Sequence, residues 1–190
     1  MATLTTTIST TVRNNATMAL LRAGFLLGSR FAPAATVRRA ARLFCTPFAS
    51  SRTRALATPT AGATEALIRV GEELIATYQW GDPKRQPYVL FAHGWSSHGT
   101  RILPWLDALR EAGYAVVAFD QCGHGKSSGK LATLPGFTEL LLEIGRRHGP
   151  AAAVIGHSLG GASAALALAR GLVAERAILI APAADPVDAA

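Results

Sequence analysis

From residue 65 onward, short apolar runs alternate with longer segments whose apolar residues recur at helical spacing. The runs EALIRVG (65–71) and EELIATYQWG (72–81) meet at a tight turn around Gly71 and predict an antiparallel hairpin. Short apolar runs rich in β-forming residues predict buried strands at 88–94, 115–121, 151–158 and 175–182. Helical spacing predicts helices at 101–114, 134–149 and 159–171. Because continuous apolar strands need cover on both faces, the pattern predicts an α/β fold with a doubly wound, mostly parallel sheet of about six strands.

The first 64 residues follow a different pattern. Residues 1–15 are rich in threonine and predict disorder, whereas apolar and arginine residues alternate at helical spacing in 18–31 and 36–44. Residues 50–64 are typical of a linker. We therefore divide the chain into an N-terminal extension of disorder and short helices, residues 1–64, and the N-terminal portion of an α/β domain, residues 65–190. The apolar run in the extension is too short for a stable membrane span, and Arg22 interrupts it.

The charge of the chain is unevenly distributed. The net charge is +7, yet residues 1–64 hold eight arginines and no acidic residue, so the remainder is close to neutral. Because the folded part has no basic patch, the composition excludes a nucleic-acid-binding protein. The two cysteines, Cys45 and Cys122, indicate no disulfide framework or metal cluster, which favours a cytoplasmic setting. The arginine-rich leader is also typical of a mitochondrial transit peptide, which is the alternative location.

Three sequence motifs stand at the ends of predicted strands. The strand at 88–94 ends in HGW, the strand at 115–121 ends in DQCGHGKSSG, and the strand at 151–158 ends in GHSLGG. Because the carboxyl ends of parallel strands share one edge of a sheet, the three motifs are expected to lie together where ligands bind. The last motif fits G-x-S-x-G, in which a serine occupies a sharp strand-to-helix turn. Glycines two residues before and after the serine remove Cβ atoms that would clash in that turn.

On the motifs FAHGW (91–95), FDQCGHGKSSG (119–129) and GHSLGG (156–161), residues 65–190 resemble the N-terminal part of an α/β-hydrolase-fold protein. The resemblance implies that Ser158 is the nucleophile and that the backbone N–H groups of Leu159 and Trp95 bind the oxyanion. It implies structural roles at the site for His93, Gly94, Asp120, Gly156, His157 and Gly160. A serine points to esters, thioesters or related acyl bonds of a small-molecule substrate, without a cofactor or metal. Epoxide hydrolases and dehalogenases of this fold carry an aspartate at that position.

The sequence departs from the family pattern after Ser158. The family places an acid and then a histidine after the serine; Asp185 is a candidate acid, but no histidine follows Ser158. None of the five histidines occupies the family's place for the general base: His93, His98, His124, His148 and His157. A serine without a base is a poor nucleophile, so we expect impaired activity from these 190 residues.

Three explanations for the missing histidine stay open. The sequence is a fragment of a longer hydrolase, which we favour because the predicted strand at 175–182 would otherwise be an unpaired apolar edge. Alternatively, a second chain supplies the missing strands. The third explanation is a non-catalytic binding or interaction protein on a truncated hydrolase scaffold.

Overall fold

The computed structural model describes residues 2–183, with side chains described from residue 16 onward. The chain divides into two compact units, Met1–Phe44 and Cys45–Ala190. The boundary differs from the predicted one at residue 64, because residues 45–64 belong to the same unit as the sheet.

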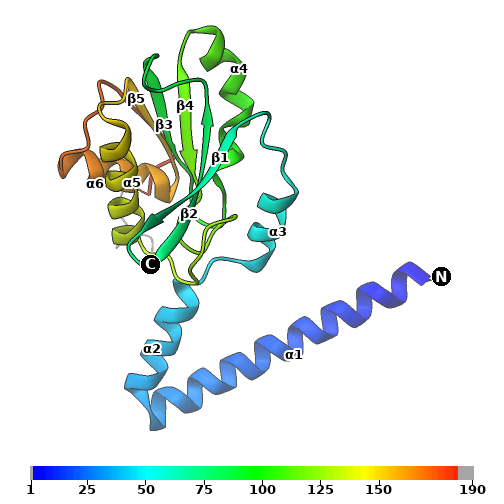
Figure 1. The fold of residues 1–190 in the computed structure, drawn as a ribbon. Coiled ribbons are helices and arrows are strands. Elements are labelled where there is room, and N and C mark those ends of the chain that lie inside the picture. Colours follow the sequence, from blue (N-terminus) through cyan, green and yellow to red (C-terminus); the bar gives the residue numbers. More distant parts are fainter. Residues whose placement is uncertain (1, 184–190) are drawn as a thin grey trace. The chain divides into compact units, whose positions relative to one another are not determined.

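The first unit consists of two helices, α1 (Ala2–Phe31) and α2 (Pro33–Phe44), which Figure 1 draws in blue. Residues 2–15, for which the sequence predicts disorder, belong to α1. Threonine has only a modest helix penalty, and elongating an existing helix is far easier than nucleating one. The apolar segment at 18–31 can therefore carry the helix back through the threonine-rich residues. None of the helices in the described part of the chain is long and apolar enough to cross a membrane.

The second unit is built on a six-stranded sheet in the order β1-β2-β4-β3-β5-β6, counted over the described residues. The strands are β1 (Thr64–Val70), β2 (Glu73–Trp80), β3 (Tyr88–Ala92), β4 (Ala115–Phe119), β5 (Ala153–His157) and β6 (Ala177–Ile180). β1 and β2 form the predicted antiparallel hairpin around Gly71, whose φ of 56° suits a glycine. β2 is antiparallel to β4, while β4, β3, β5 and β6 run parallel. The α/β fold with a mostly parallel sheet is therefore confirmed.

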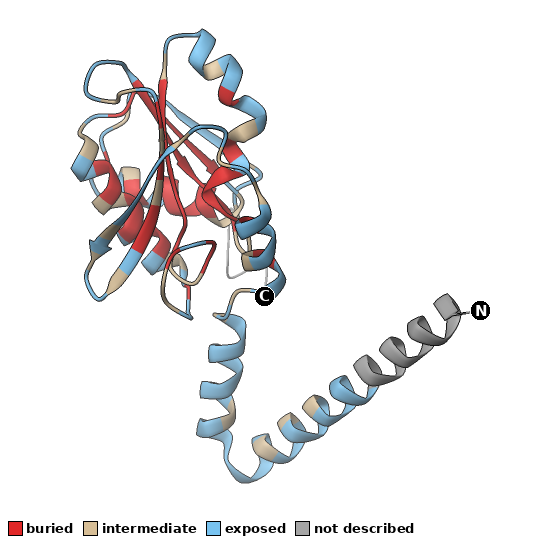
Figure 2. Ribbon diagram, turned by 45° about the vertical axis from the view of Figure 1, so that its right-hand side comes forward, coloured by how far each residue is buried: buried red, intermediate tan, exposed pale blue. Residues whose placement is uncertain are grey.

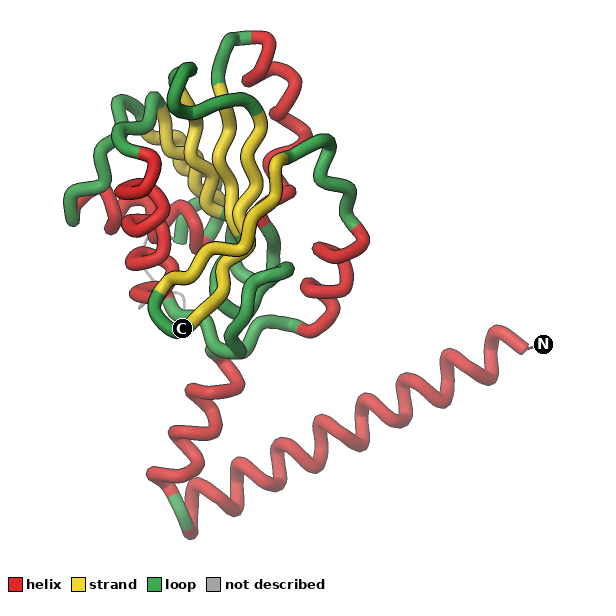
Figure 3. Tube along the Cα trace, in the orientation of Figure 1, coloured by secondary structure: helices red, strands yellow, loops and turns green. Residues whose placement is uncertain are grey.

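Helices cover both faces of this sheet (Figure 3). On one face, Leu90 and Val117 pack with apolar residues of α5 (Leu134–His148) and α6 (Leu159–Ala169). On the other, Val89 and Phe91 pack against the 3₁₀ turn η1 (Gly99–Ile102) and α4 (Leu103–Glu111). Successive side chains of a strand point to opposite faces, so the central strands are buried throughout (Figure 2).

Two elements differ from the prediction. The helix predicted over 101–114 is divided into η1 and the shorter α4, and Pro104 lies in the first turn of α4, where its missing N–H has no cost. Residues predicted as a linker form the helix α3 (Ala49–Ala57). Only Ser51 and Ala55 of α3 are buried, and two small residues at i and i+4 give no hydrophobic pattern to detect.

β6 is an edge strand whose side chains are largely exposed. It is shorter than predicted and pairs with β5 along one side. Ile178 is 49% exposed and Leu179 is 37% exposed, in contrast to the buried central strands.

Candidate active site

Ser158 occupies the junction between β5 and α6 with an unusual backbone conformation. Its φ is 54° and its ψ is −122°, a region that side chains with a Cβ rarely adopt. The Ser158 amide donates to the carbonyl oxygen of Ile180 at 2.9 Å, and the Ser158 carbonyl accepts from the amides of Gly161 and Ala162 at 2.8 and 3.2 Å. β6 and the first turn of α6 thus fix the strained residue from both sides.

Glycines make this turn possible. A Cβ added at Gly156 would come within 2.6 Å of the Gly160 carbonyl oxygen. A Cβ added at Gly160 would collide with the carbonyl oxygens of Ala92 and His93 at the end of β3. Real Cβ atoms do not approach backbone so closely, so Gly156 allows α6 to start close to β5, and Gly160 allows it to pack against the end of β3.

The loop after β3 packs directly on Ser158. A Cβ added at Gly94 would come within 2.9 Å of the Ser158 Cβ and 3.0 Å of the His157 carbonyl oxygen. Trp95 follows Gly94, so its amide belongs to the same loop. Among the described residues, neither the Trp95 nor the Leu159 amide donates a hydrogen bond. Two available backbone donors therefore belong to the segments that flank Ser158.

The His93 side chain holds the loop after β3 in place through hydrogen bonds. The fully buried ring accepts a hydrogen bond from the Gln121 amide at Nε2, 3.0 Å, and therefore donates from Nδ1 to the Gly94 carbonyl, 2.7 Å. Burial, reinforced by the neighbouring His124, lowers the pKa of His93 to about 3. The ring is neutral at physiological pH and ties the end of β3 to the end of β4.

His124 makes a parallel connection. Its Nε2 accepts from the Ser96 amide at 3.0 Å, and its Nδ1 lies 2.9 Å from the Cys122 carbonyl oxygen. Burial lowers the pKa of His124 as well. Because both ring nitrogens of His93 and His124 have backbone partners, neither ring has a nitrogen available to accept a proton from Ser158.

Asp120 links three segments beneath the site. One carboxylate oxygen accepts from the Tyr78 hydroxyl at 2.7 Å and the Lys126 amide at 2.8 Å, and the other accepts from the Gly99 amide at 2.7 Å. Burial and the Asp120 charge raise the pKa of Tyr78. A Cβ at Gly125 would overlap the Asp120 carboxyl group, so the turn after β4 closes around this side chain.

Sequence reasoning did not identify Tyr78 or Ser127 as part of this network. The Ser127 hydroxyl donates to the Asp120 carbonyl at 2.6 Å and accepts from the Ala76 amide at 2.9 Å. Tyr78 lies on β2, and nothing in an alternating strand marks a tyrosine as a partner of a residue 42 positions later.

Asp185, the candidate acid, lies outside the described residues. The described residues contain no group of three or more histidine, cysteine or acidic side chains that could hold a metal.

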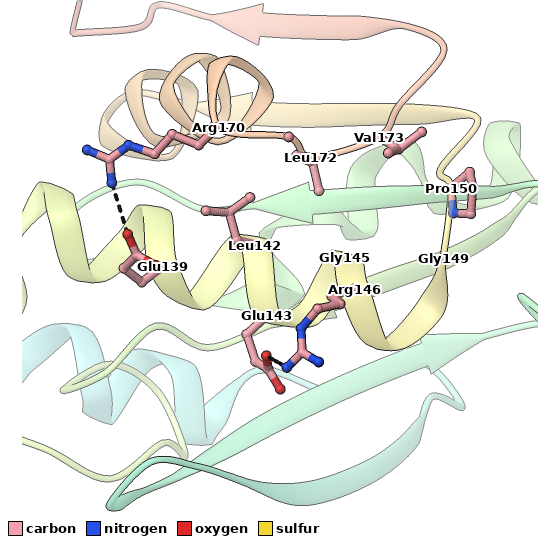
Figure 4. Close-up of a pocket in the computed structure, with 11 residues that line it drawn as sticks. Glu139, Leu142, Glu143, Gly145, Arg146, Gly149, Pro150, Arg170, Leu172 and Val173 are labelled. Atoms are coloured by element: carbon pink, nitrogen blue, oxygen red, sulfur yellow. Dashed lines mark hydrogen bonds and ion pairs between the residues drawn. The ribbon is translucent and has the colours of Figure 1, made fainter.

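Two cavities of the sheet unit differ in their relation to Ser158. A cavity of about 410 Å³ is lined by α5 and by Leu172 and Val173 after α6 (Figure 4). Gly149 and Pro150 in its wall precede β5, so it lies at the amino ends of the strands. A cavity of about 670 Å³ is lined by His157 at the end of β5, by residues after β3 and by the end of α3, and therefore lies at the carboxyl ends of the strands.

Comparisons with known proteins match the chain to one family model and to several solved structures. A family model described as "Serine aminopeptidase, S33" matches residues 83–189. A thioesterase domain from the curacin biosynthetic pathway is 27% identical with a TM-score of 0.58, over 67% of this chain and 49% of that one. A proline iminopeptidase-related protein from Thermus thermophilus is 27% identical with a TM-score of 0.53, over 63% of this chain and 45% of that one.

A third solved structure extends the range of chemistry. Epoxide hydrolase A from Mycobacterium thermoresistibile is 28% identical with a TM-score of 0.51, over 58% of this chain and 37% of that one. The chain thus spans about half the length, or less, of the solved structures it matches. No curated protein sequence matches the chain.

Proposed function

The chain belongs to the serine aminopeptidase family (S33) of α/β-hydrolases, and on that premise we propose that Ser158 is the nucleophile of a hydrolase acting on ester, thioester or related acyl bonds. The observation that carries the proposal is the backbone of Ser158, whose φ of 54° holds the residue on the strand-to-helix junction against Gly94. Strain of this kind persists only where the surroundings enforce it, and it concentrates at functional sites.

The neighbouring amides support an oxyanion hole. As the Ser158 Oγ attacks a carbonyl carbon, the carbonyl oxygen gains negative charge and would accept hydrogen bonds from the Leu159 and Trp95 N–H groups. The amino end of α6 adds its positive dipole end at the same place. The serine proton passes to a general base, the alcohol, thiol or amine leaves with a proton, and water then releases the acyl group from Ser158.

The residue type at position 158 favours acyl chemistry within the family. Epoxide hydrolases of this fold resemble the chain but carry an aspartate where this chain has Ser158. The matched thioesterase domain and the peptidase-related protein are both named for acyl bonds. The substrate of this chain is therefore proposed to be a small molecule with an ester, thioester or related acyl bond.

The general base is proposed to come from polypeptide beyond these 190 residues. No histidine follows Ser158, and His93 and His124 have backbone partners at both ring nitrogens. Among the described residues, β6 pairs on one side only, and its Ile178 and Leu179 side chains are partly exposed, so its other edge would accept a further strand of the same protein or of a second chain. The 190-residue chain alone is therefore expected to turn over esters poorly.

Chemical rescue tests the nucleophile separately from the base. The chain would be incubated with p-nitrophenyl acetate and imidazole, which supplies a base, and acetylation would be located by mass spectrometry. Acetylation at Ser158 that rises with imidazole and is absent in Ser158→Ala supports the proposal. Acetylation spread over lysines, equal in both chains, contradicts it.

A non-catalytic binding protein on the same scaffold is the second candidate, because the rings of His93 and His124 both have backbone partners at each nitrogen and hold loops rather than a reacting group. The two candidates differ in the rescue experiment, because a scaffold that only binds has no need of a reactive hydroxyl. Failure of acetylation at Ser158 at every imidazole concentration, in a chain shown to be folded, supports the binding protein.

A further inference from the structure

The cavity of about 670 Å³ that is lined by His157, the residue before Ser158, has a mixed lining of basic and neutral polar side chains together with the apolar Ala57, Leu103 and Pro104. We call it the basic pocket and define it by six of its lining residues: Arg54, Thr58, Ser96, His98, Arg101 and His157. Its walls come from α3, from the loop and 3₁₀ turn after β3, and from the residue preceding Ser158. No acidic residue lines it.

The two arginines of the basic pocket have no carboxylate partner. Neither Arg54 nor Arg101 takes part in an ion pair within the part of the chain that the structure describes. The cavity in Figure 4 is the opposite case, because its Arg170 pairs with Glu139 and its Arg146 pairs with Glu143. Two uncompensated guanidinium groups in one concave site attract an anion.

His98, which lines the basic pocket, lies within electrostatic reach of both arginines. His98 is 7% exposed, and its Nδ1 lies 2.6 Å from the Thr100 Oγ1. Burial lowers the pKa of His98; the Asp120 charge opposes this shift, and the smaller effects of the positive charges of Arg101 and Arg54 add to it. Both guanidinium groups therefore lie within electrostatic reach of one imidazole. The ring is neutral near pH 7 and adds a polar contact, while the arginines carry the positive charge.

The α3 wall is fixed to the loops that surround Ser158. The Phe48 amide donates to the Ser96 Oγ at 3.0 Å, and the Arg52 Nη2 donates to the Ser127 carbonyl oxygen at 2.7 Å. At the end of α3, the Thr58 hydroxyl donates a hydrogen bond to the Arg54 carbonyl oxygen at 2.8 Å. Arg54 is thus carried by an anchored helix rather than by a loose linker.

We propose that the basic pocket binds an anionic group, a carboxylate or a phosphate, of the acyl substrate that reacts at Ser158. The inference rests on the proposed function, because the link between the pocket and the reaction is His157, which lines the pocket and precedes the proposed nucleophile. It narrows the substrate class to acyl compounds that carry a negative charge near the reacting carbonyl. Planar guanidinium groups suit both carboxylate and phosphate oxygens.

The test measures anion binding without any chemistry at Ser158. The full chain would be titrated with glutarate and, separately, with inorganic phosphate at constant pH and ionic strength, while NMR follows the imidazole resonances of His98 and His157. We expect saturable shifts, and about tenfold weaker binding in each of Arg54→Gln and Arg101→Gln, as for loss of one charge-assisted hydrogen bond. Arg110→Gln, an exposed arginine of α4 outside the pocket, is the matched control and should bind as the parent does.

The two anions distinguish the sources of the charge. Tighter glutarate binding supports an acyl group that ends in a carboxylate, and tighter phosphate binding supports a phosphate on the leaving group. Absence of saturable shifts with both anions, or equal weakening in Arg110→Gln, overturns the proposal. Ser158→Ala should bind both anions unchanged, so a chain that binds them but is never acetylated at Ser158 contradicts the hydrolase and not the pocket.

Discussion

Gly94 lies so close to Ser158 that a methyl group on its Cα would reach within 2.9 Å of the serine Cβ. The contact joins the loop after β3 to the strand-to-helix junction after β5, two segments separated by more than sixty residues in the sequence. Trp95 directly follows Gly94, so its amide belongs to the segment that packs on Ser158.

Gly94→Ala is therefore expected to reduce the free energy of unfolding by about 1–3 kcal/mol, the usual cost of overpacking. Urea denaturation followed by tryptophan fluorescence measures it, since all three tryptophans lie in the sheet unit. Gly136→Ala is the control, because a Cβ there meets only the Thr133 Oγ1, at 3.3 Å, and alanine favours a helix. Equal losses in the two variants would contradict the close contact.

Ser158→Gly should make the chain more stable than Ser158→Ala. Both substitutions remove the hydroxyl, but only glycine relieves the strain of a φ of 54° with a ψ of −122°. The alanine variant keeps a backbone strain of about 1–3 kcal/mol, which the glycine variant loses. Because an unfolded glycine has more conformational entropy, the expected difference in the free energy of unfolding is about 1–2 kcal/mol in favour of Ser158→Gly. Urea denaturation of the two variants gives the difference. Identical stabilities would mean that the serine backbone is unstrained.

The parts of the site that could be predicted from the sequence are those that need special residues. Gly156, Gly160 and Ser158 form a turn that few residue types tolerate, so the motif carries its own geometry. The strands could be predicted because a buried strand of a parallel sheet is continuously apolar, and β3, β4 and most of β5 are buried as expected.

The parts that could not be predicted depend on contacts between distant segments. α3 is fixed by Phe48 and Arg52, whose partners Ser96 and Ser127 lie 48 and 75 residues later. The basic pocket could not be predicted from the sequence either, because Arg54 belongs to a stretch whose composition is typical of a linker. Local patterns report propensity and periodicity, and neither encodes which distant loop a polar residue will meet.

Burial of His93 predicts a pH dependence of stability. The folded chain takes up the proton of His93 at a pKa of about 3, whereas an unfolded histidine does so near 6.5. The unfolded state therefore binds more protons between these values, and the contribution of His93 is complete above pH 6.5 and is lost as the pH falls toward 3. Each pH unit in that window costs roughly 1.4 kcal/mol for this one proton.

Urea denaturation at a series of pH values tests this dependence by comparing the parent with His93→Asn. The variant should be less stable above pH 7, because the Gln121 amide loses its acceptor. Between pH 6 and 4, the free energy of unfolding of the variant should nevertheless fall less steeply than that of the parent. The difference in slope should correspond to about one proton. Parallel curves for the two chains would show that His93 is not the buried neutral group described above.

Tyr78→Phe tests the support beneath the loops that carry the Trp95 amide and the basic pocket. The variant keeps the ring but removes the hydroxyl that donates to the buried Asp120 carboxylate at 2.7 Å, and a hydrogen bond to a charged acceptor contributes about 1.5–3 kcal/mol. The same carboxylate accepts from Gly99, so the Gly99 amide should exchange its hydrogen faster in the variant. Tyr114→Phe is the control, because the Tyr114 hydroxyl makes no hydrogen bond among residues 16–183. A loss of stability in Tyr78→Phe without faster exchange at Gly99 would mean that Asp120 stabilises the sheet but does not hold the loop.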